Sequence, residues 1–277
     1  MSRATRVPVG RLAALAAVVV AGLAIARAAR APHWRELMPG VEFATMRGEP
    51  YCRSGSSAIA LLRLDPARVR LRALHYLREP DHRPLAIAEW LQRTGALAVF
   101  NAGQYYPDLT YMGLFVSNGE VVSRRVHPGF RAALVAEPDG RDSLRGRRAR
   151  VLDLARDPLD ADRPGWREVA QSFMLFDRDG APRVRQTDQV AGRTAVGEDA
   201  EGRIVVVTSE GGYTLWDFAR LLHGARLGLA TAMSMDGGRE AQMIVDAGGL
   251  HYASYGRDPS GSPAPAPLPA VVAVMPR

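Results

Sequence analysis

The sequence predicts an α+β fold: a mixed β-sheet with hairpins and at least one strand-helix-strand crossover unit, in a single globular domain that follows an N-terminal leader. Three observations predict it. Short β-type runs recur along the chain, an Asn-Gly pair separates two apolar runs, and one amphipathic helix pattern lies between two apolar strands.

The first half of the chain contains the β-type runs. They are rich in β-branched and apolar residues, and one helical pattern at 85–92 lies between the third and fourth of them. The runs span 41–46, 58–64, 69–76 and 96–100.

A hairpin is predicted at Asn118 and Gly119, which separate the apolar runs 112–116 and 121–123. Both residues tolerate the positive φ that a type I′ turn requires.

The crossover unit is predicted in the second half. Thr214 is an N-cap followed three residues later by Asp217, and apolar residues then recur at helical spacing up to Gly224. The apolar run 229–235 follows as a buried strand, and 204–207 precedes as another, which suggests two parallel strands joined by a helix. The final run, 270–275, is predicted to be an edge strand.

The N-terminus resembles a leader. Arg3, Arg6 and Arg11 precede an uncharged apolar run from Leu12 to Ala26, which is short for a membrane span. We therefore expect residues 1–31 to be a signal peptide or signal anchor, and residues 32–277 to be exported, either periplasmic or anchored in the inner membrane facing the periplasm. Contact with the membrane is expected only through this N-terminal segment.

Charge and composition narrow the function classes. The net charge is +7, but five of the 36 basic residues lie in the leader, and the chain contains no lysine. The rest of the chain is nearly balanced, so a nucleic-acid partner is not expected. The single cysteine, Cys52, cannot form an internal disulfide, and the six histidines have no zinc-binding spacing. No cofactor is expected to be required; a calcium ion held by carboxylates and carbonyls stays open, as does the oligomeric state.

The segment from Asp236 to Glu240 is the most suggestive candidate site. A carboxylate follows a predicted buried strand, and Gly237 and Gly238 would let a ligand approach the backbone, whose amides can bind an anion. An ordinary turn leaving a strand uses the same residues, so this motif alone is weak evidence.

Two further candidates lie elsewhere in the chain. Asn101 and Gly103 follow the strand at 96–100, where an Asn can bind a sugar hydroxyl, although both residue types are also common in loops. Arg193 opens a strand-like run and could bind phosphate with two hydrogen bonds.

Taken in order, these motifs resemble the phosphodiester glycosidase family, which includes the lysosomal enzyme that uncovers mannose-6-phosphate tags. The matching elements are an Asn-Ala-Gly at 101–103, the glycine and hairpin at 112–119, the segment 171–175, an Arg-x-Ala-x-Gly at 193–197, a Gly-x-Thr-Leu at 212–215 and a Met-Asp-Gly-Gly at 235–238. The resemblance covers about residues 96–274.

The resemblance implies hydrolysis of a glycosidic C1–O–phosphate bond in an envelope or exported polysaccharide or glycoconjugate. Asp236 is then the expected catalytic carboxylate, with Glu240 or Glu210 as its partner. The expected phosphate ligands are Arg193, Arg239 and the amides of Gly237 and Gly238. The expected ligands of the sugar are Asn101, Gly103 and Thr214.

The sequence departs from the family after the two glycines, where Arg239 and Glu240 replace the usual Gly-Ser or Ser-Ser. An alternative therefore stays open, in which the domain has lost catalysis and binds cell-envelope polysaccharide or peptidoglycan.

Overall fold

The computed structural model describes residues 31–140, 146–257 and 262–277. Apart from Ala31, the predicted leader lies outside these ranges, so its role stays a prediction. Among the described residues, no helix has the length and apolar character that spanning a membrane requires.

The described residues contain sixteen strands and two α-helices. The strands are β1 (Arg35–Met38), β2 (Val41–Arg47), β3 (Ala58–Leu64), β4 (Val69–His75), β5 (Ala98–Asn101), β6 (Phe115–Ser117), β7 (Glu120–Ser123), β8 (Ala132–Pro138), β9 (Ala149–Asp153), β10 (Trp166–Phe176), β11 (Thr194–Asp199), β12 (Ile204–Ser209), β13 (Leu229–Ser234), β14 (Met243–Ala247), β15 (Leu250–Ser254) and β16 (Ala270–Pro276). The helices are α2 (Ile87–Thr94) and α3 (Leu215–Gly224), with short 3₁₀ turns η1 (Tyr76–Arg78) and η2 (Gly238–Glu240).

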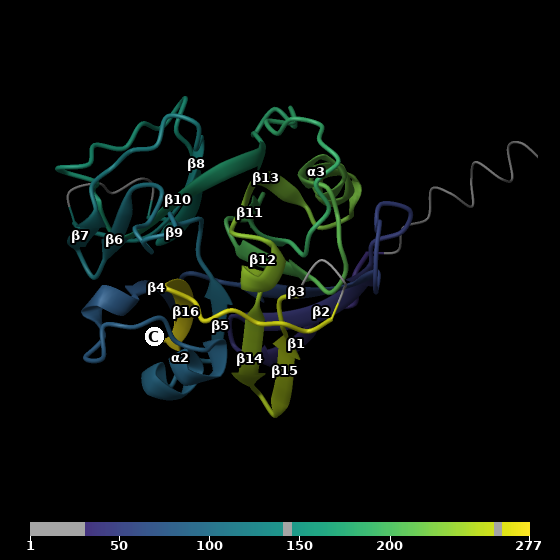
Figure 1. Ribbon diagram of the computed structural model, residues 1–277, viewed down its shortest axis with the longest axis horizontal. Helices are drawn as coiled ribbons and strands as arrows, with labels where there is room; N and C mark the ends of the chain where they lie inside the picture. The colour runs from purple at the N-terminus through teal and green to yellow at the C-terminus, as the bar shows by residue number, and fades with distance from the viewer. Residues whose placement is uncertain (1–30, 141–145, 258–261) are drawn as a thin grey trace, which may run out of the picture. The chain divides into compact units, whose positions relative to one another are not determined.

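The strands of the described residues form two antiparallel sheets (Figure 1). The larger one has eleven strands in the order β1-β2-β3-β12-β11-β13-β10-β6-β7, with β8 beside β10 and β9 beside β8. The smaller one has five, in the order β15-β14-β5-β16-β4.

The predicted α+β class with a mixed sheet and a crossover unit is wrong: the described part of the chain is mostly β-sheet, and its strand pairs are antiparallel. The helix α3 does connect β12 to β13, but these strands are not neighbours, because β11 lies between them and pairs antiparallel with both. Periodicity along one segment indicates a strand or a helix, but it does not indicate which strands become partners.

The last strand is also not at an edge. β16 pairs with β4 on one side and β5 on the other, and its residues are buried up to Val274. The Pro-rich segment before it suggested an edge, but those prolines precede the strand and leave its own amides free to pair.

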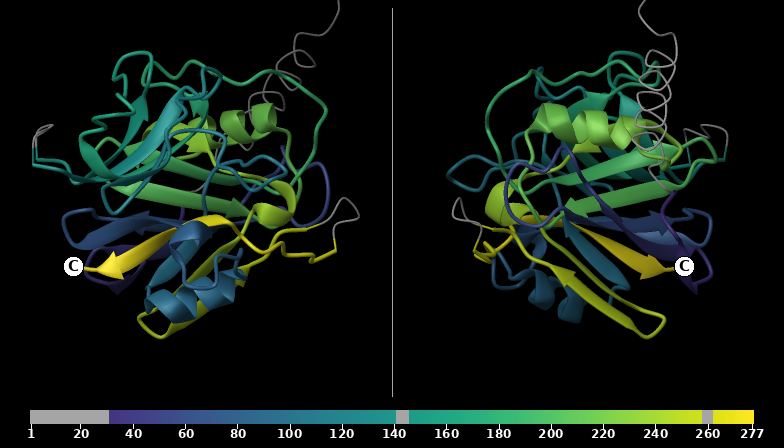
Figure 2. Two further views of the ribbon diagram at one scale, coloured as in Figure 1. Left: turned by 60° about the vertical axis from the view of Figure 1, so that its left-hand side comes forward. Right: turned by 90° about the vertical axis from the view of Figure 1, so that its right-hand side faces the viewer.

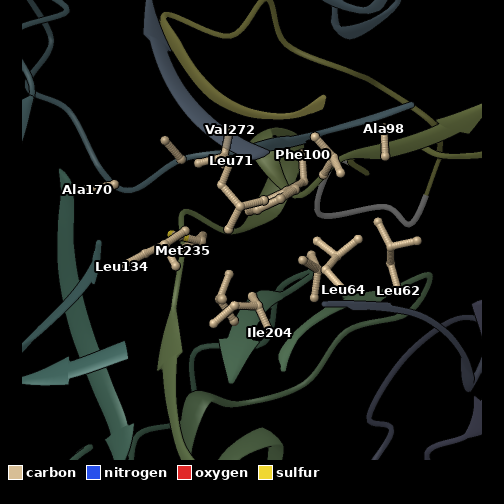
Figure 3. Packing of buried hydrophobic residues seen from close by; sticks show 14 of the residues in the cluster. Leu62, Leu64, Leu71, Ala98, Phe100, Leu134, Ala170, Ile204, Met235 and Val272 are labelled. Carbon is tan, nitrogen blue, oxygen red and sulfur yellow. The ribbon is translucent and has the colours of Figure 1, made fainter. Parts of the chain in front are cut away.

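The main core lies between the two sheets, where apolar side chains from both meet (Figure 3). Because side chains alternate along a strand, each sheet also has a second apolar face. On β5, Phe100 faces the inter-sheet core and Val99 packs in the cluster that includes Trp90 of α2. On β12, Val206 faces the inter-sheet core and Val207 packs in the cluster that includes α3 (Figure 2). Each helix therefore covers the outer face of one sheet.

Two sequence predictions on local structure are confirmed. The Asn118-Gly119 turn joins β6 to β7 with φ of 51° and 82°. The helix α3 begins after Thr214, whose side chain accepts a hydrogen bond from the amide of Asp217.

Candidate active site

The turn after β13 carries Asp236 and joins the two sheets. The amide of Asp236 donates to the carbonyl of Ala102, just after β5, over 3.0 Å, and the amide of Met235 donates to the carbonyl of Thr194 in β11 over 2.8 Å. Since β13 and β11 belong to the large sheet and β5 to the small one, the carboxylate lies where the ends of the two sheets meet.

Asn101 holds this turn in place. Its side-chain amide donates to the carbonyl of Asp236 over 2.9 Å, and its side-chain oxygen accepts from the amide of Gln242 over 3.1 Å. Asn101 is 1% exposed, so one buried side chain fixes both ends of the loop that contains Glu240. This geometry suits a positioning residue; direct contact of Asn101 with a sugar stays a prediction.

Arg193 lies beside the same turn in a buried position. Its Nε donates to the carbonyl of Tyr213 over 2.9 Å and its Nη2 to the carbonyl of Gln189 over 2.7 Å, while Nη1 lies on the side of Gly237. Burial lowers the pKa of Arg193 to about 10, against the opposing attraction of Asp236. The guanidinium thus stays protonated at neutral pH and places a positive charge next to the carboxylate.

Burial raises the pKa of Asp236 to about 7, and the negative charge of Glu240 adds to the increase. A hydrogen bond from the amide of Gly237 to Oδ1, 2.8 Å long, and the charge of Arg193 oppose it. A carboxyl with this pKa is present in both protonation states near neutral pH, which is what a group that transfers protons requires.

Tyr105 completes the cluster, although it was not among the predicted site residues. Its hydroxyl donates to Oε1 of Glu240 over 3.1 Å. Burial and the negative charges of Glu240 and Asp236 raise the pKa of Tyr105, so it remains a hydrogen-bond donor at neutral pH. It lies among several tyrosines after β5, and the sequence offered no signal that would single it out from the others.

The predicted glycine ligands already have partners in the protein. The amide of Gly237 bonds Asp236, that of Gly238 donates to the carbonyl of Gly192 over 2.9 Å, and that of Gly103 donates to the hydroxyl of Tyr111 over 3.1 Å. A Cβ at position 103 would lie 2.4 Å from that hydroxyl, so this glycine is needed for close packing. Amide contacts to phosphate from Gly237 and Gly238 stay a prediction that would require these bonds to be shared or broken.

A cleft of about 640 Å³ lies next to this cluster. Among the described residues, its lining includes Glu210, Gly238 and Arg239, but not the side chains of Asn101, Arg193 or Asp236. Gly192 directly precedes Arg193, and Gly238 follows Asp236 by two residues; both glycines line the cleft, and they are hydrogen-bonded to each other over 2.9 Å.

Two of the predicted site residues, Glu210 and Arg239, line the cleft. Glu210 accepts a hydrogen bond from the hydroxyl of Tyr252 over 3.2 Å, and Arg239 donates from Nε to the carbonyl of Ala264 over 2.9 Å. Arg239 is exposed. Thr214 lines a second, smaller cavity at the start of α3 and not the cleft.

No group of three or more His, Cys, Asp or Glu side chains in the described ranges is arranged to hold a metal ion.

A sequence profile of the phosphodiester glycosidase family matches residues 94–275. The chain belongs to this family. The match covers the Asn101, Arg193 and Asp236 motifs on which the resemblance was based, and so confirms it.

Solved structures share the fold of this chain. The catalytic domain of zebrafish N-acetylglucosamine-1-phosphodiester alpha-N-acetylglucosaminidase is 18% identical, with a TM-score of 0.63 over 90% of this chain and 87% of that one. A hypothetical protein from Synechocystis is 13% identical, with a TM-score of 0.61 over 90% of this chain and 64% of that one. No curated protein matches the sequence.

The cluster combines two carboxyl groups with one guanidinium group. Asp236 and Glu240 can face a positively charged sugar centre, and the Arg193 guanidinium can face a phosphate oxygen. Asp236 and Glu240 lie in one loop that Asn101 holds, and Arg193 directly precedes β11, which pairs with β13 in the large sheet.

Proposed function

We propose that this protein hydrolyses the bond between the anomeric carbon of a sugar and a phosphodiester oxygen. One observation carries the proposal: the half-buried carboxyl of Asp236, with a pKa of about 7, lies close to the charges of Glu240 and Arg193, and the next residues of its loop, Gly238 and Arg239, line a cleft of about 640 Å³. Membership of the phosphodiester glycosidase family supports the same reaction class.

In the proposed reaction, the C1–O bond breaks as water adds to the anomeric carbon. The bonding electrons leave on the phosphate oxygen, and the products are a free sugar and a phosphate monoester. As the sugar develops oxocarbenium character, the ionised Asp236 stabilises it or takes a proton from the attacking water. Glu240, held by Tyr105, adds negative charge.

Arg193 would balance the negative charge of the leaving phosphate. Its buried guanidinium would stabilise the negative charge that grows on the leaving phosphate, and the exposed Arg239 in the cleft would hold a further phosphate oxygen. Since a phosphate ester is a good leaving group, the proposal needs no separate general acid.

The proposed substrate is a polysaccharide or glycoconjugate of the cell envelope, or an exported one. The predicted leader at 1–31 supports this location, because it would direct the domain out of the cytoplasm.

The test is release of sugar from a panel of sugar-1-phosphodiesters and teichoic acid fragments by the purified protein. Asp236→Asn keeps the size of the side chain and an oxygen that can accept from Gly237, so the turn should persist while sugar release is lost. Asp246→Asn is the matched control, because Asp246 lies on β14 with its side chain 61% exposed.

Equal sugar release by both variants would contradict the proposed role of Asp236. Binding of polysaccharide without any release by the unmodified protein would favour the alternative, a catalytically silent envelope domain of the same fold.

A further inference from the structure

We propose that the smaller cavity beside the cleft binds a neutral sugar ring, so that the substrate is an oligosaccharide or polysaccharide and not a single sugar on phosphate. This inference rests on the proposed function where it names the substrate, but the sugar site can be tested by itself. The cavity has a volume of about 180 Å³ and lies at the start of α3.

The lining has the chemistry of a sugar site. Trp216, half-buried, gives an aromatic surface that can pack against the C–H face of a pyranose ring. Gln186, Thr187 and Asp188 give an amide, a hydroxyl and a carboxylate, which together can donate to and accept from sugar hydroxyls. An apolar surface with a few polar groups around it is the usual make-up of a small-molecule site.

The charges of the cavity disfavour phosphate. Its guanidinium, Arg53, is neutralised by Asp217, whose Oδ2 lies 2.8 Å from Nε and 2.7 Å from Nη2. Asp217 is 5% exposed, so the buried carboxylate fixes the position of the Arg53 guanidinium. The remaining charged group of the described lining is Asp188, which would repel an anion. A neutral ligand therefore fits this cavity better than an anion.

The neighbouring cleft has more basic side chains than the smaller cavity, since its described lining includes Arg239 and Arg257 as well as Glu210. The two hollows are contiguous, because Arg53 and Val190 line both. A ligand with its phosphate in the cleft could therefore extend over Val190, which is 41% exposed, and place a further sugar against Trp216.

Thr214 can donate a hydrogen bond to a sugar in the smaller cavity. Its hydroxyl oxygen accepts from the amide of Asp217 over 3.0 Å, but the hydroxyl hydrogen is still available to a ligand. The sugar contact predicted for Thr214 would then be made in the smaller cavity and not beside Asp236.

The binding test uses the purified full-length protein and four neutral trisaccharides: maltotriose, cellotriose, mannotriose and chitotriose. We expect saturable binding of at least one by calorimetry, weakened about tenfold or more by Trp216→Ala, since an aromatic contact contributes on that scale. Trp216→Phe keeps an aromatic ring and should retain most of the affinity. Trp34→Ala is the matched control, because Trp34 is also half-buried but lines neither hollow.

The inference is overturned if the unmodified protein binds none of the four trisaccharides, or if Trp216→Ala binds them as well as Trp34→Ala does. A lowered melting temperature of Trp216→Ala relative to Trp216→Phe would indicate a folding defect. In that case the test uses Trp216→Phe, which should retain most of the affinity, and Gln186→Ala, which should weaken binding.

The same experiments separate this inference from the proposed function. Asp236→Asn should bind the trisaccharides like the unmodified protein, because Asp236 does not line the cavity. If no phosphodiester is cleaved but binding depends on Trp216, only the proposed reaction fails. If cleavage depends on Asp236 but binding is indifferent to Trp216, only the sugar site fails.

Discussion

Asp236, which is half-buried, and Glu168, which is buried, are two carboxyl groups that have the same raised pKa in very different surroundings. Burial raises the pKa of each to about 7. Asp236 lies beside a cleft, with Glu240 and Arg193 nearby. Oε2 of Glu168 accepts from the amide of Ala73 over 2.9 Å and from that of Asn118 over 3.2 Å.

The position of Glu168 explains its role. It projects from β10 of the large sheet to Ala73 on β4, which is the last strand of the small sheet and has amides that no further strand pairs. Glu168 thus ties the two sheets together, whereas Asp236 bonds mainly to its own turn. A shifted pKa by itself therefore does not identify a catalytic group; the neighbouring charges and the cleft do.

The largest expected effect is on sugar release. Asp236→Asn should lower the rate by roughly 10²- to 10⁴-fold, the usual contribution of a positioned acid or base. Glu168→Gln keeps an oxygen for both amides and should leave the rate close to that of the unmodified protein. Steady-state kinetics on a sugar-1-phosphodiester measures both, and a loss of similar size in Glu168→Gln would break the comparison.

For the free energy of unfolding, substitution of Glu168 should have a larger effect than substitution of Asp236. Glu168→Ala leaves the amides of Ala73 and Asn118 without their acceptor and should cost about 2 to 3 kcal/mol in the free energy of unfolding, mostly from the buried amide of Ala73. Asp236→Ala removes the acceptor of one amide, that of Gly237, and should cost about 1 to 2 kcal/mol. Urea denaturation of the two variants compares them; a larger loss in Asp236→Ala would contradict the assigned roles.

Titration of Glu168 should contribute to the pH dependence of the free energy of unfolding. Its pKa is about 7 in the folded protein and its ordinary value, expected in the unfolded chain, is 4.5, so the folded state binds more protons between these two pH values. The free energy of unfolding should therefore fall as pH rises from about 4.5 to about 7 and change little above that, for this group. Glu168→Gln should flatten this part of the curve in denaturation experiments run at several pH values, and an unchanged slope would refute the assignment.

The smallest effect should be a shift in the pH profile of activity. If the ionised form of Asp236 acts, kcat/KM should rise with pH, with its midpoint at about 7. Glu240→Gln removes a negative charge that raises the pKa of Asp236, so the midpoint should move to lower pH. Glu201→Gln, at an exposed side chain, is the matched control. A midpoint that stays in place in Glu240→Gln would show that the two carboxyls are not coupled.

The sequence determined the local structure and the family. The turn at Asn118 and Gly119 and the helix start at Thr214 follow from rules that act within a few residues, namely positive φ and side-chain capping. The ordered motifs around Asn101, Arg193 and Asp236 were likewise enough to indicate the family that the sequence profile confirms.

Only the tertiary structure decided the sheet partners and the surroundings of each site residue. Whether β12 and β13 pair depends on β11 lying between them, which neither segment encodes. The hydroxyl of Tyr105 reaches Glu240 across 135 positions of sequence, and the pKa of Asp236 depends on burial where two sheets meet. Such features depend on distance and solvent exposure in the folded protein, and residue order alone does not specify either.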